Sequence, residues 1–411
     1  MIDPQNLPMI EEARDLLKDR LLGERRADKA WEGRLASSAV STAVAALAMS
    51  LFEEDSERLS LAIDWLVSNV NADGGWGDTP KSPSNLSAVM LVRTSLVNSR
   101  SEDPRISAAL DKSANWLDRP LDGCDSEGLV AKILQFYGKD LTFSAPILTV
   151  GLLGGVFGHD ENLWKSVPSL PFEAALIPSR FFNLLNLPVV SYAIPALVAV
   201  GIAQTTHSPP NHLALRWLRE RSIRPALRKL SRLVPSSGGF LEAAPLTGFV
   251  AFCLGRSGFS GHEIVQKGLH FLRSTMRDDG SWPIDTNLSN WLTTLSSRAL
   301  CQNDALSSDE RSALVSYLLN TQTKSVNVFT GAPPNGWSWT DLPGGVPDAD
   351  DTAAALVALA HLRQGPADVA VAGGLQWLLD LMNRDGGIPT FCKGWGYLPF
   401  EIGRASCRER V

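Results

Sequence analysis

One local pattern recurs along the chain and limits the folds that are open to it. An apolar stretch with helical spacing is followed by a turn rich in glycine, an aromatic residue and the start of another helix. The aromatic residues are Trp76, Phe240, Trp282 and Trp337, and Ile388 takes the same place in WLLDLMNRDGGIP. From Phe240 onward the spacing is roughly 40–55 residues, which is enough for two helices per repeat. The pattern therefore predicts paired helices stacked one after another.

The rest of the chain agrees with an all-α fold. Apolar residues recur with the 3.6-residue period of a helix, and no run alternates as a strand would. Such repeats form either a closed α/α barrel, also called an α/α toroid, or an open solenoid, and the irregular spacing favours the barrel. We expect Ser84, Asp285 and Asp351 to cap the helices that follow the turns, and the glycine pairs to end the helices before them.

Composition narrows the class of protein. The chain has 411 residues, 44% of them hydrophobic and 20% charged, which favours two globular domains. Its net charge of −6 and the expected absence of a basic run or basic–aromatic patch argue against nucleic acid as a partner. The five cysteines are far apart and form no Cys/His cluster, so a reduced setting and no metal are expected.

Two long stretches carry no charge. They are Leu141–Gly158 and Phe181–Ala203, and their length alone would allow a transmembrane helix. Pro188 and Pro195 interrupt the second stretch and make one straight spanning helix awkward. Buried core helices are the preferred interpretation, followed by a surface that dips into one leaflet, and then by a true span.

The densest cluster of ionisable groups is Asp348, Asp350 and Asp351, at the start of the apolar run AAALVALAHL. One interpretation is an acidic helix N-terminus that is favoured by the helix dipole. The other is a general acid, because crowded carboxylates raise the pKa of at least one member and keep it protonated. Trp337, Trp339 and Trp291 lie close in sequence, and they either fill the core or stabilise a carbocation over their faces.

Together these segments resemble the squalene–hopene cyclases, a family of class II terpene cyclases. VPDADDTAAALVAL resembles the acid motif of that family, and Gly336–Trp339 resembles the aromatic segment before it. The glycine–aromatic turns resemble its QW repeats, and Phe143–Leu197 resembles its membrane-contacting region. The resemblance runs from about Trp31 to Phe400. The glutamine of the QW repeats is kept at Gln322 and replaced at the other turns, by Val70, Met276 and Met382.

The resemblance implies two α/α barrels, the first inserted near the N-terminus of the second. Residues 1–30 would begin the second barrel, 31–233 would form the first, and 234–401 would return to the second and carry the acids. The second barrel is expected to be incomplete here, and the chain alone to have little activity. Residues 402–411 read like translated sequencing-adapter DNA and are set aside.

The resemblance also implies the chemistry. Asp350 would donate a proton to an alkene of squalene or a similar linear isoprenoid and start a cyclisation, an isomerase reaction. Asp348 and Asp351 would be its carboxylate partners, and Trp339 and Trp291 would line the cavity, with Trp337 as a further substrate contact. No metal and no cofactor would be needed. The enzyme would lie on the cytoplasmic side of a membrane as a monotopic protein. The resemblance leaves open whether it forms a homodimer.

Two alternatives remain at this point. The replaced glutamines suggest a non-catalytic isoprenoid-binding or scaffold protein built on the same helical repeats. A relative of the protein prenyltransferase β-subunit would share the α/α barrel but would need a zinc site of Asp, Cys and His, and no motif of that kind is recognisable in the sequence.

Overall fold

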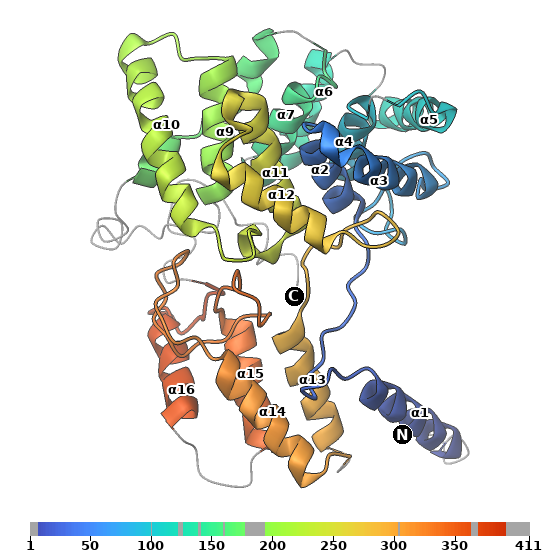
Figure 1. Cartoon of the computed structure of the whole chain (residues 1–411), viewed down its shortest axis with the longest axis vertical. Coiled ribbons are helices and arrows are strands. Elements are labelled where there is room, and N and C mark those ends of the chain that lie inside the picture. The colour runs from blue at the N-terminus through green and yellow to red at the C-terminus, as the bar shows by residue number, and fades with distance from the viewer. Residues whose placement is uncertain are drawn as a thin grey trace. The chain divides into compact units, whose positions relative to one another are not determined.

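The structure is a computed structural model that describes residues 7–99, 101–121, 126–138, 141–158, 161–176, 194–302, 305–362 and 369–391 (Figure 1). The chain divides into two compact units. One consists of Leu35–Thr286 and is called the inserted unit here. The other combines Met1–Arg34 with Asn287–Trp395 and is called the acid unit, because it contains Asp348, Asp350 and Asp351. The expected tail at 402–411 lies outside the described residues.

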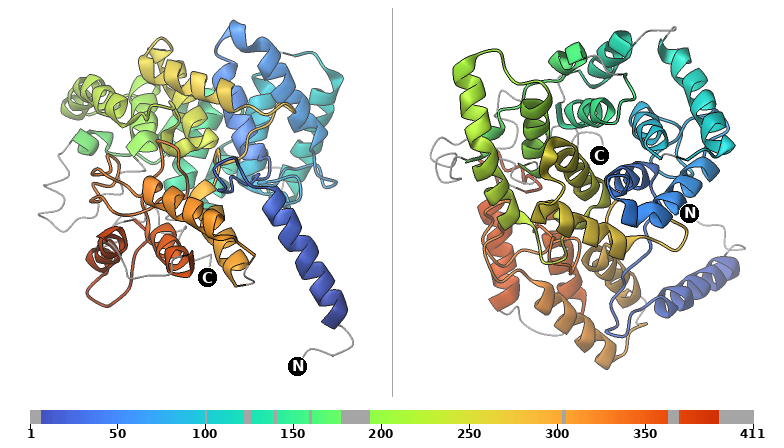
Figure 2. Two further views of the ribbon diagram at one scale, coloured as in Figure 1. Left: turned by 60° about the horizontal axis from the view of Figure 1, so that its bottom comes forward. Right: turned by 45° about the horizontal axis from the view of Figure 1, so that its top comes forward.

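The inserted unit is an α/α barrel. Its inner helices contact one another in the order α2, α4, α7, α9, α11 and back to α2, which closes the ring. They are α2 (Ala39–Met49), α4 (Leu86–Val97), α7 (Leu141–Leu153), α9 (Ile194–His207) and α11 (Ala244–Leu254). The outer helices are α3 (Ser56–Ser68), α5 (Pro104–Leu121), α6 (Ser126–Tyr137), α10 (Leu213–Leu233) and α12 (Glu263–Thr275). Figure 2 shows the two layers from other sides.

Residue character explains which helices lie inside. Almost every residue of α2, AVSTAVAALAM, is buried, as expected for a helix whose side chains are mostly small and apolar on all sides. The strongly amphipathic α12 buries only Ile264, Val265, Leu269 and their neighbours on one face. Short helical turns join the layers: η2 (Glu53–Asp55), η3 (Glu161–Ser166), η4 (Phe172–Leu176), η6 (Phe240–Glu242) and η7 (Gly255–Phe259).

The acid unit repeats the helix pair in a smaller form. It contains α1 (Leu7–Gly23), α13 (Ser289–Cys301), α14 (Ser308–Thr321), α15 (Ala349–Leu362) and α16 (Val369–Leu381). Helix α15 packs against α13, α14 and α16. Among the described residues every regular element is a helix, so the prediction of an all-α fold with α/α toroid repeats is confirmed.

The structure divides the chain later than the sequence-based boundary at 233. Residues 234–286 belong to the inserted unit. Arg273 of α12 holds the buried Asp55 with two hydrogen bonds of 2.8 and 2.7 Å. The backbone N–H of Trp282 donates to the Thr42 hydroxyl at 3.1 Å. These long-range bonds tie the segment to the N-terminal helices of the inserted unit, and the repeat pattern alone does not reveal them.

The recurring turn has one geometry. The residue two places before the aromatic position adopts a positive φ of 86–91° at Gly74, Gly238, Gly280 and Gly386, and Asn335 has the same φ of 87°. In three copies the tryptophan is buried and its indole N–H donates to a backbone carbonyl of the preceding helix: Trp76 to Leu66, Trp282 to Leu272 and Trp337 to Leu318. The glycines do not end the helices as expected, because α3 already ends at Ser68 and α12 at Thr275.

A further copy of the turn was not predicted. Lys29 has a positive φ of 71°, and the indole N–H of Trp31 donates to the Leu21 carbonyl at 2.7 Å. The Asp28 side chain accepts the N–H of Ala30, as Asp279 does for Ser281. The copy lacks glycine and therefore the sequence signal, yet it fixes Trp31 in the core of the acid unit.

Gly280 offers a test of the turn. A methyl group at this position would lie 2.5 Å from the Leu61 carbonyl oxygen, whereas Gly258 has nearly the same φ, 89°, and nothing within 4 Å. We expect Gly280→Ala to lower the free energy of unfolding by more than about 2 kcal/mol, and Gly258→Ala by about 1 kcal/mol, the cost of φ alone. Urea unfolding followed by circular dichroism measures both. Equal losses would show that the close approach carries no energy.

The uncharged stretches form part of the core where they are described. Helices α7 and α9 are inner helices, with Leu148, Val150, Val198 and Ile202 almost fully buried. The preferred interpretation of buried helices is thus confirmed for these parts, while residues 177–193, which include most of the expected membrane-contacting segment, lie outside the described residues. No helix within the described ranges combines the length and apolar character that crossing a bilayer requires.

Candidate active site

The three carboxylates lie at the N-terminal end of α15. The Asp348 Oδ1 accepts the backbone N–H of Asp351 at 2.8 Å, and the Asp348 N–H donates to the Trp337 carbonyl at 3.0 Å. Asp348 is therefore the residue that caps α15, and the prediction that Asp351 does so is wrong. The predicted caps Ser84 and Asp285 are also wrong, because Asn85 caps α4 and no side chain caps α13.

The three acids differ in exposure and in pKa. Asp348 and Asp351 are 4% and 6% exposed, whereas Asp350 is exposed. Burial raises the pKa of Asp348 well above its usual range, and the charge of Asp351 adds to the effect. Burial also raises the pKa of Asp351 to about 6, although the hydrogen bond from the Asp348 side chain lowers it. The charge of Asp350 raises the pKa of both.

These facts describe a buried carboxyl pair beside an accessible one. A hydrogen bond links the side chains of Asp348 and Asp351, and burial favours the protonated form of both. The Asp351 Oδ1 is buried and has no hydrogen-bond partner among the described residues. Asp350 alone presents its carboxyl where a ligand could reach it. The arrangement suits proton transfer by Asp350 next to two acids whose protonated forms are favoured by burial.

The aromatic segment before the acids is held from two sides. Trp337 is completely buried, its indole N–H donates to Leu318 and its backbone N–H to the Thr352 hydroxyl at 2.9 Å. Trp337 is therefore a core residue that supports the acid helix, and its contact with a substrate stays a prediction. The other side of the segment contacts the start of α13, where the backbone N–H groups of Asn290 and Trp291 donate to the Trp339 carbonyl.

The two other candidate aromatics, Trp339 and Trp291, are thus joined by a backbone hydrogen bond. Trp339 and Trp291 are both partly exposed. The indole N–H of Trp339 is buried and has no acceptor among the described residues. This is a cost that most proteins avoid. Their role as cavity aromatics stays a prediction.

Two asparagines hold the aromatic segment, and sequence reasoning did not identify them. The Asn290 side-chain amide donates to the carbonyls of Ser338 and Thr340 at 2.8 and 3.1 Å. The Asn287 Oδ1 accepts the Thr340 hydroxyl at 2.6 Å. Both side chains are buried. The only signal in the sequence is their position just before a helix, which is also where ordinary capping residues occur.

The raised pKa of Asp348 predicts a pH-dependent stability. Between the unfolded and the folded pKa the folded state binds more protons, so the free energy of unfolding falls as the pH rises above about 4. Asp348→Asn keeps the capping oxygen and removes this loss. We expect the variant to be more stable than the parent by roughly 1–3 kcal/mol at pH 7 and nearly equal at pH 4. Urea midpoints at pH 4, 5.5 and 7 measure the difference.

Asp309→Asn is the matched control for this experiment. Asp309 also lies in the first turn of a helix, α14, but it is exposed. Its replacement should leave the stability within about 0.5 kcal/mol at each pH. A gain in Asp348→Asn that does not change with pH would contradict the buried-proton interpretation.

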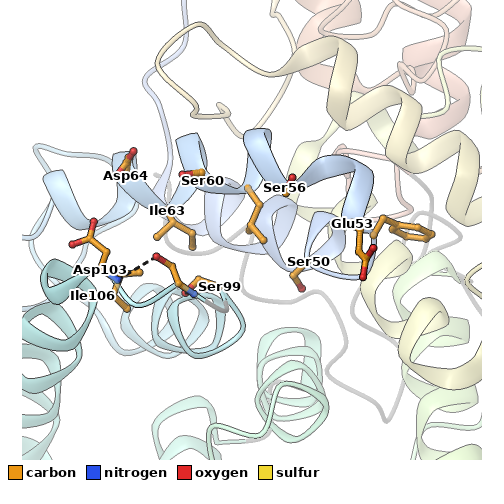
Figure 3. Close-up of a pocket in the computed structure, with 12 residues that line it drawn as sticks. Ser50, Glu53, Ser56, Ser60, Ile63, Asp64, Ser99, Asp103 and Ile106 are labelled. Carbon is orange, nitrogen blue, oxygen red and sulfur yellow. Dashed lines mark hydrogen bonds between the residues drawn. The ribbon is translucent and has the colours of Figure 1, made fainter.

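A separate hollow of about 430 Å³ lies in the inserted unit (Figure 3). Its lining is rich in hydroxyl and carboxylate groups and contains none of Asp348, Asp350 and Asp351. The lining residues are Ser50, Phe52, Glu53, Ser56, Leu59, Ser60, Ile63, Asp64, Ser99, Ser101, Asp103 and Ile106. Such a lining does not suit a hydrocarbon chain or a carbocation, which water and nucleophilic oxygens would trap. We assign no part of the acid chemistry to this hollow.

Comparison with known proteins gives the chain its relatives. It is 24% identical to enfumafungin synthase efuA of Hormonema carpetanum over 91% of this chain. It is 27% identical to sporulenol synthase of Bacillus subtilis (strain 168) over 39% of this chain, and 32% identical to the terpene cyclase-glycosyl transferase fusion protein fsoA of Humicola fuscoatra over 57%. The matches cover 32%, 26% and 18% of those proteins. No protein-family model matches the chain.

All three relatives are terpene cyclases. The match to the first spans nearly the whole chain. The chain spans about a third or less of the length of these relatives. On these grounds the chain is similar to terpene cyclases over most of its length.

Proposed function

We propose that the protein is a cyclase that protonates an alkene of a linear isoprenoid, with squalene or a similar polyprene as substrate. The observation that carries the proposal is the arrangement at α15: an exposed Asp350 beside the buried Asp348 and Asp351. Asp350 gives its proton to a terminal alkene carbon, and the electron pair of that alkene forms the new C–H bond. The resulting carbocation is attacked by the next double bond, and each attack closes a ring.

The environment of the acids supports this step. Protonating an alkene demands a strong acid, and the neutral Asp348 reduces the negative charge beside the carboxylate that Asp350 leaves behind. The faces of Trp339 and Trp291 stabilise cationic intermediates by roughly 0.5–2 kcal/mol per ring. Loss of a proton from the last cation makes the reaction an isomerisation, which needs neither metal nor cofactor. The polyprene is water-insoluble, so we also propose that the protein works on the cytoplasmic surface of a membrane.

Product analysis tests the proposal. The purified protein is incubated with squalene and, separately, with a linear diterpenyl diphosphate, and extracts are analysed by gas chromatography and mass spectrometry. We expect cyclic products with the mass of the substrate, or of its hydrate when water captures the last cation. If a folded enzyme forms no cyclic product from any linear isoprenoid, the protein is instead a binding or scaffold protein.

A further inference from the structure

Helix α10 concentrates positive charge on a chain that is negative as a whole. Seven of its residues are Lys or Arg and one, Glu220, is acidic, whereas the net charge of the chain is −6. The basic residues are Arg216, Arg219, Arg221, Arg224, Arg228, Lys229 and Arg232. The prediction that the chain has no basic run is therefore wrong, because α10 is one. Figure 1 shows the helix at the outer edge of the inserted unit, beside α9.

The charged and apolar residues of α10 share one outward face. Its buried residues include Ser222, Ala226 and Leu230, which face α9 and η4. The opposite face follows from the period of the helix and carries Leu213, Trp217, Arg221, Arg224 and Arg228 in one stripe. The guanidinium carbon of Arg221 lies 5.1 Å from the centre of the Trp217 ring. The stripe is apolar at its N-terminal end and cationic along the rest.

Nothing within the described part of the chain neutralises the cationic part. Arg224, Arg228 and Arg232 are exposed and form no ion pair with a described residue. They follow one another at four-residue spacing, where like charges destabilise a helix by a few tenths of a kcal/mol per pair. The fold gains nothing visible in return. An external anion at this face would remove the repulsion.

The apolar end is just as exposed. Leu213 is 80% and Trp217 60% exposed, and every residue from Asn211 to Leu218 lies on the surface. Leu215 and Leu218 are exposed as well. Tryptophan and leucine beside arginine are the residues that helices use at a lipid–water boundary, where the rings lie among headgroups and the cations contact phosphates.

We propose that α10 binds the surface of an anionic phospholipid membrane. Leu213 and Trp217 enter the headgroup–acyl boundary, and Arg224 and Arg228 contact lipid phosphates. Nucleic acid fits less well, because the rest of the chain is acidic and the exposed leucines would have no partner there. The proposal concerns attachment and does not rest on the acid chemistry, so Asp350→Asn should bind vesicles like the parent.

Vesicle co-sedimentation tests the proposal with the purified chain. Vesicles of phosphatidylcholine are compared with vesicles that contain 30% phosphatidylglycerol, at about 100 and 400 mM NaCl. We expect binding to the anionic vesicles that weakens strongly at high salt. Arg224→Gln with Arg228→Gln should lower the partition coefficient on the order of 20-fold. Trp217→Ser should weaken binding without changing its dependence on salt.

Lys81→Gln with Lys112→Gln is the matched control, since both lysines are exposed and belong to the same unit. Circular dichroism and melting verify that each variant is folded, and the salt dependence of the parent needs no variant at all. Equal binding of the arginine and lysine variants, or equal binding to neutral and anionic vesicles, overturns the proposal. If the protein does not bind vesicles, binding to a DNA duplex overturns the proposal in favour of nucleic acid. A dimer that is lost on Trp217→Ser, again without vesicle binding, overturns it in favour of self-association.

Discussion

Asp350→Asn should abolish cyclisation while the protein still binds its isoprenoid. The amide has the size of the carboxylate but no transferable proton, and loss of a general acid costs on the order of 10²–10⁴-fold in rate. Because the acid here must protonate a carbon rather than an oxygen, we expect at least about 1000-fold. Asp350 is exposed at the start of α15 and makes no capping bond, so the variant should fold like the parent.

Two measurements make this result decisive. Single-turnover product formation with squalene reports the chemistry, and quenching of tryptophan fluorescence by a non-reactive squalene analogue reports binding. Asp309→Asn, an exposed acid in the first turn of α14, should leave both unchanged. A variant at Asp350 that retains full turnover would exclude it as the proton donor. Unchanged binding in a parent without turnover would favour the scaffold alternative.

Trp337→Ala should produce the largest loss of stability in the acid unit. The ring is completely buried in the core that contains Leu314, Leu318 and Leu359, and truncating such a side chain costs about 3–5 kcal/mol. The change also leaves the Leu318 carbonyl without its indole donor. Since the backbone of Trp337 bonds Asp348 and Thr352, disorder there should reach the acids.

Trp337→Phe is the milder variant at this position. It keeps an aromatic ring in the core but removes the bond to Leu318 and part of the ring volume, so we expect a smaller loss of about 1–2 kcal/mol. Urea unfolding followed by circular dichroism measures both variants. In Trp337→Ala we also expect the pH dependence of stability due to Asp348 to disappear. An alanine variant as stable as the parent would contradict the role of Trp337 as a core residue.

The sequence predicted the repeats well because their turns need unusual backbone angles. A φ near +90° is open to glycine and costs other residues energy, so GG and DG pairs mark Gly74, Gly238 and Gly280 in the sequence. The same argument explains the copy that was missed. Lys29 tolerates a positive φ before Trp31, where the surrounding bonds hold the turn without help from glycine.

The acids were also predictable, since they are neighbours in sequence, but their environment was not. The division into a buried pair and an exposed Asp350 depends on how α15 meets Trp337. The clamp by Asn287 and Asn290 joins residues about 50 positions apart. The unit boundary at Thr286 rests on bonds such as Arg273 to Asp55, which likewise connect distant segments. Local patterns carry no record of such contacts.

The split of the acid unit across the chain sets the order in which the molecule can be built. Trp31 leaves the ribosome early, but its packing partners Thr293 and Leu300 follow only after all of Leu35–Thr286 has been translated. Domains generally fold as units in the order of synthesis, so the inserted barrel matures while Trp31 still lacks these two partners. Asp348 and Asp351 are then buried last in this order of folding. A nascent chain thus lacks the buried acid pair until the inserted barrel has been synthesised.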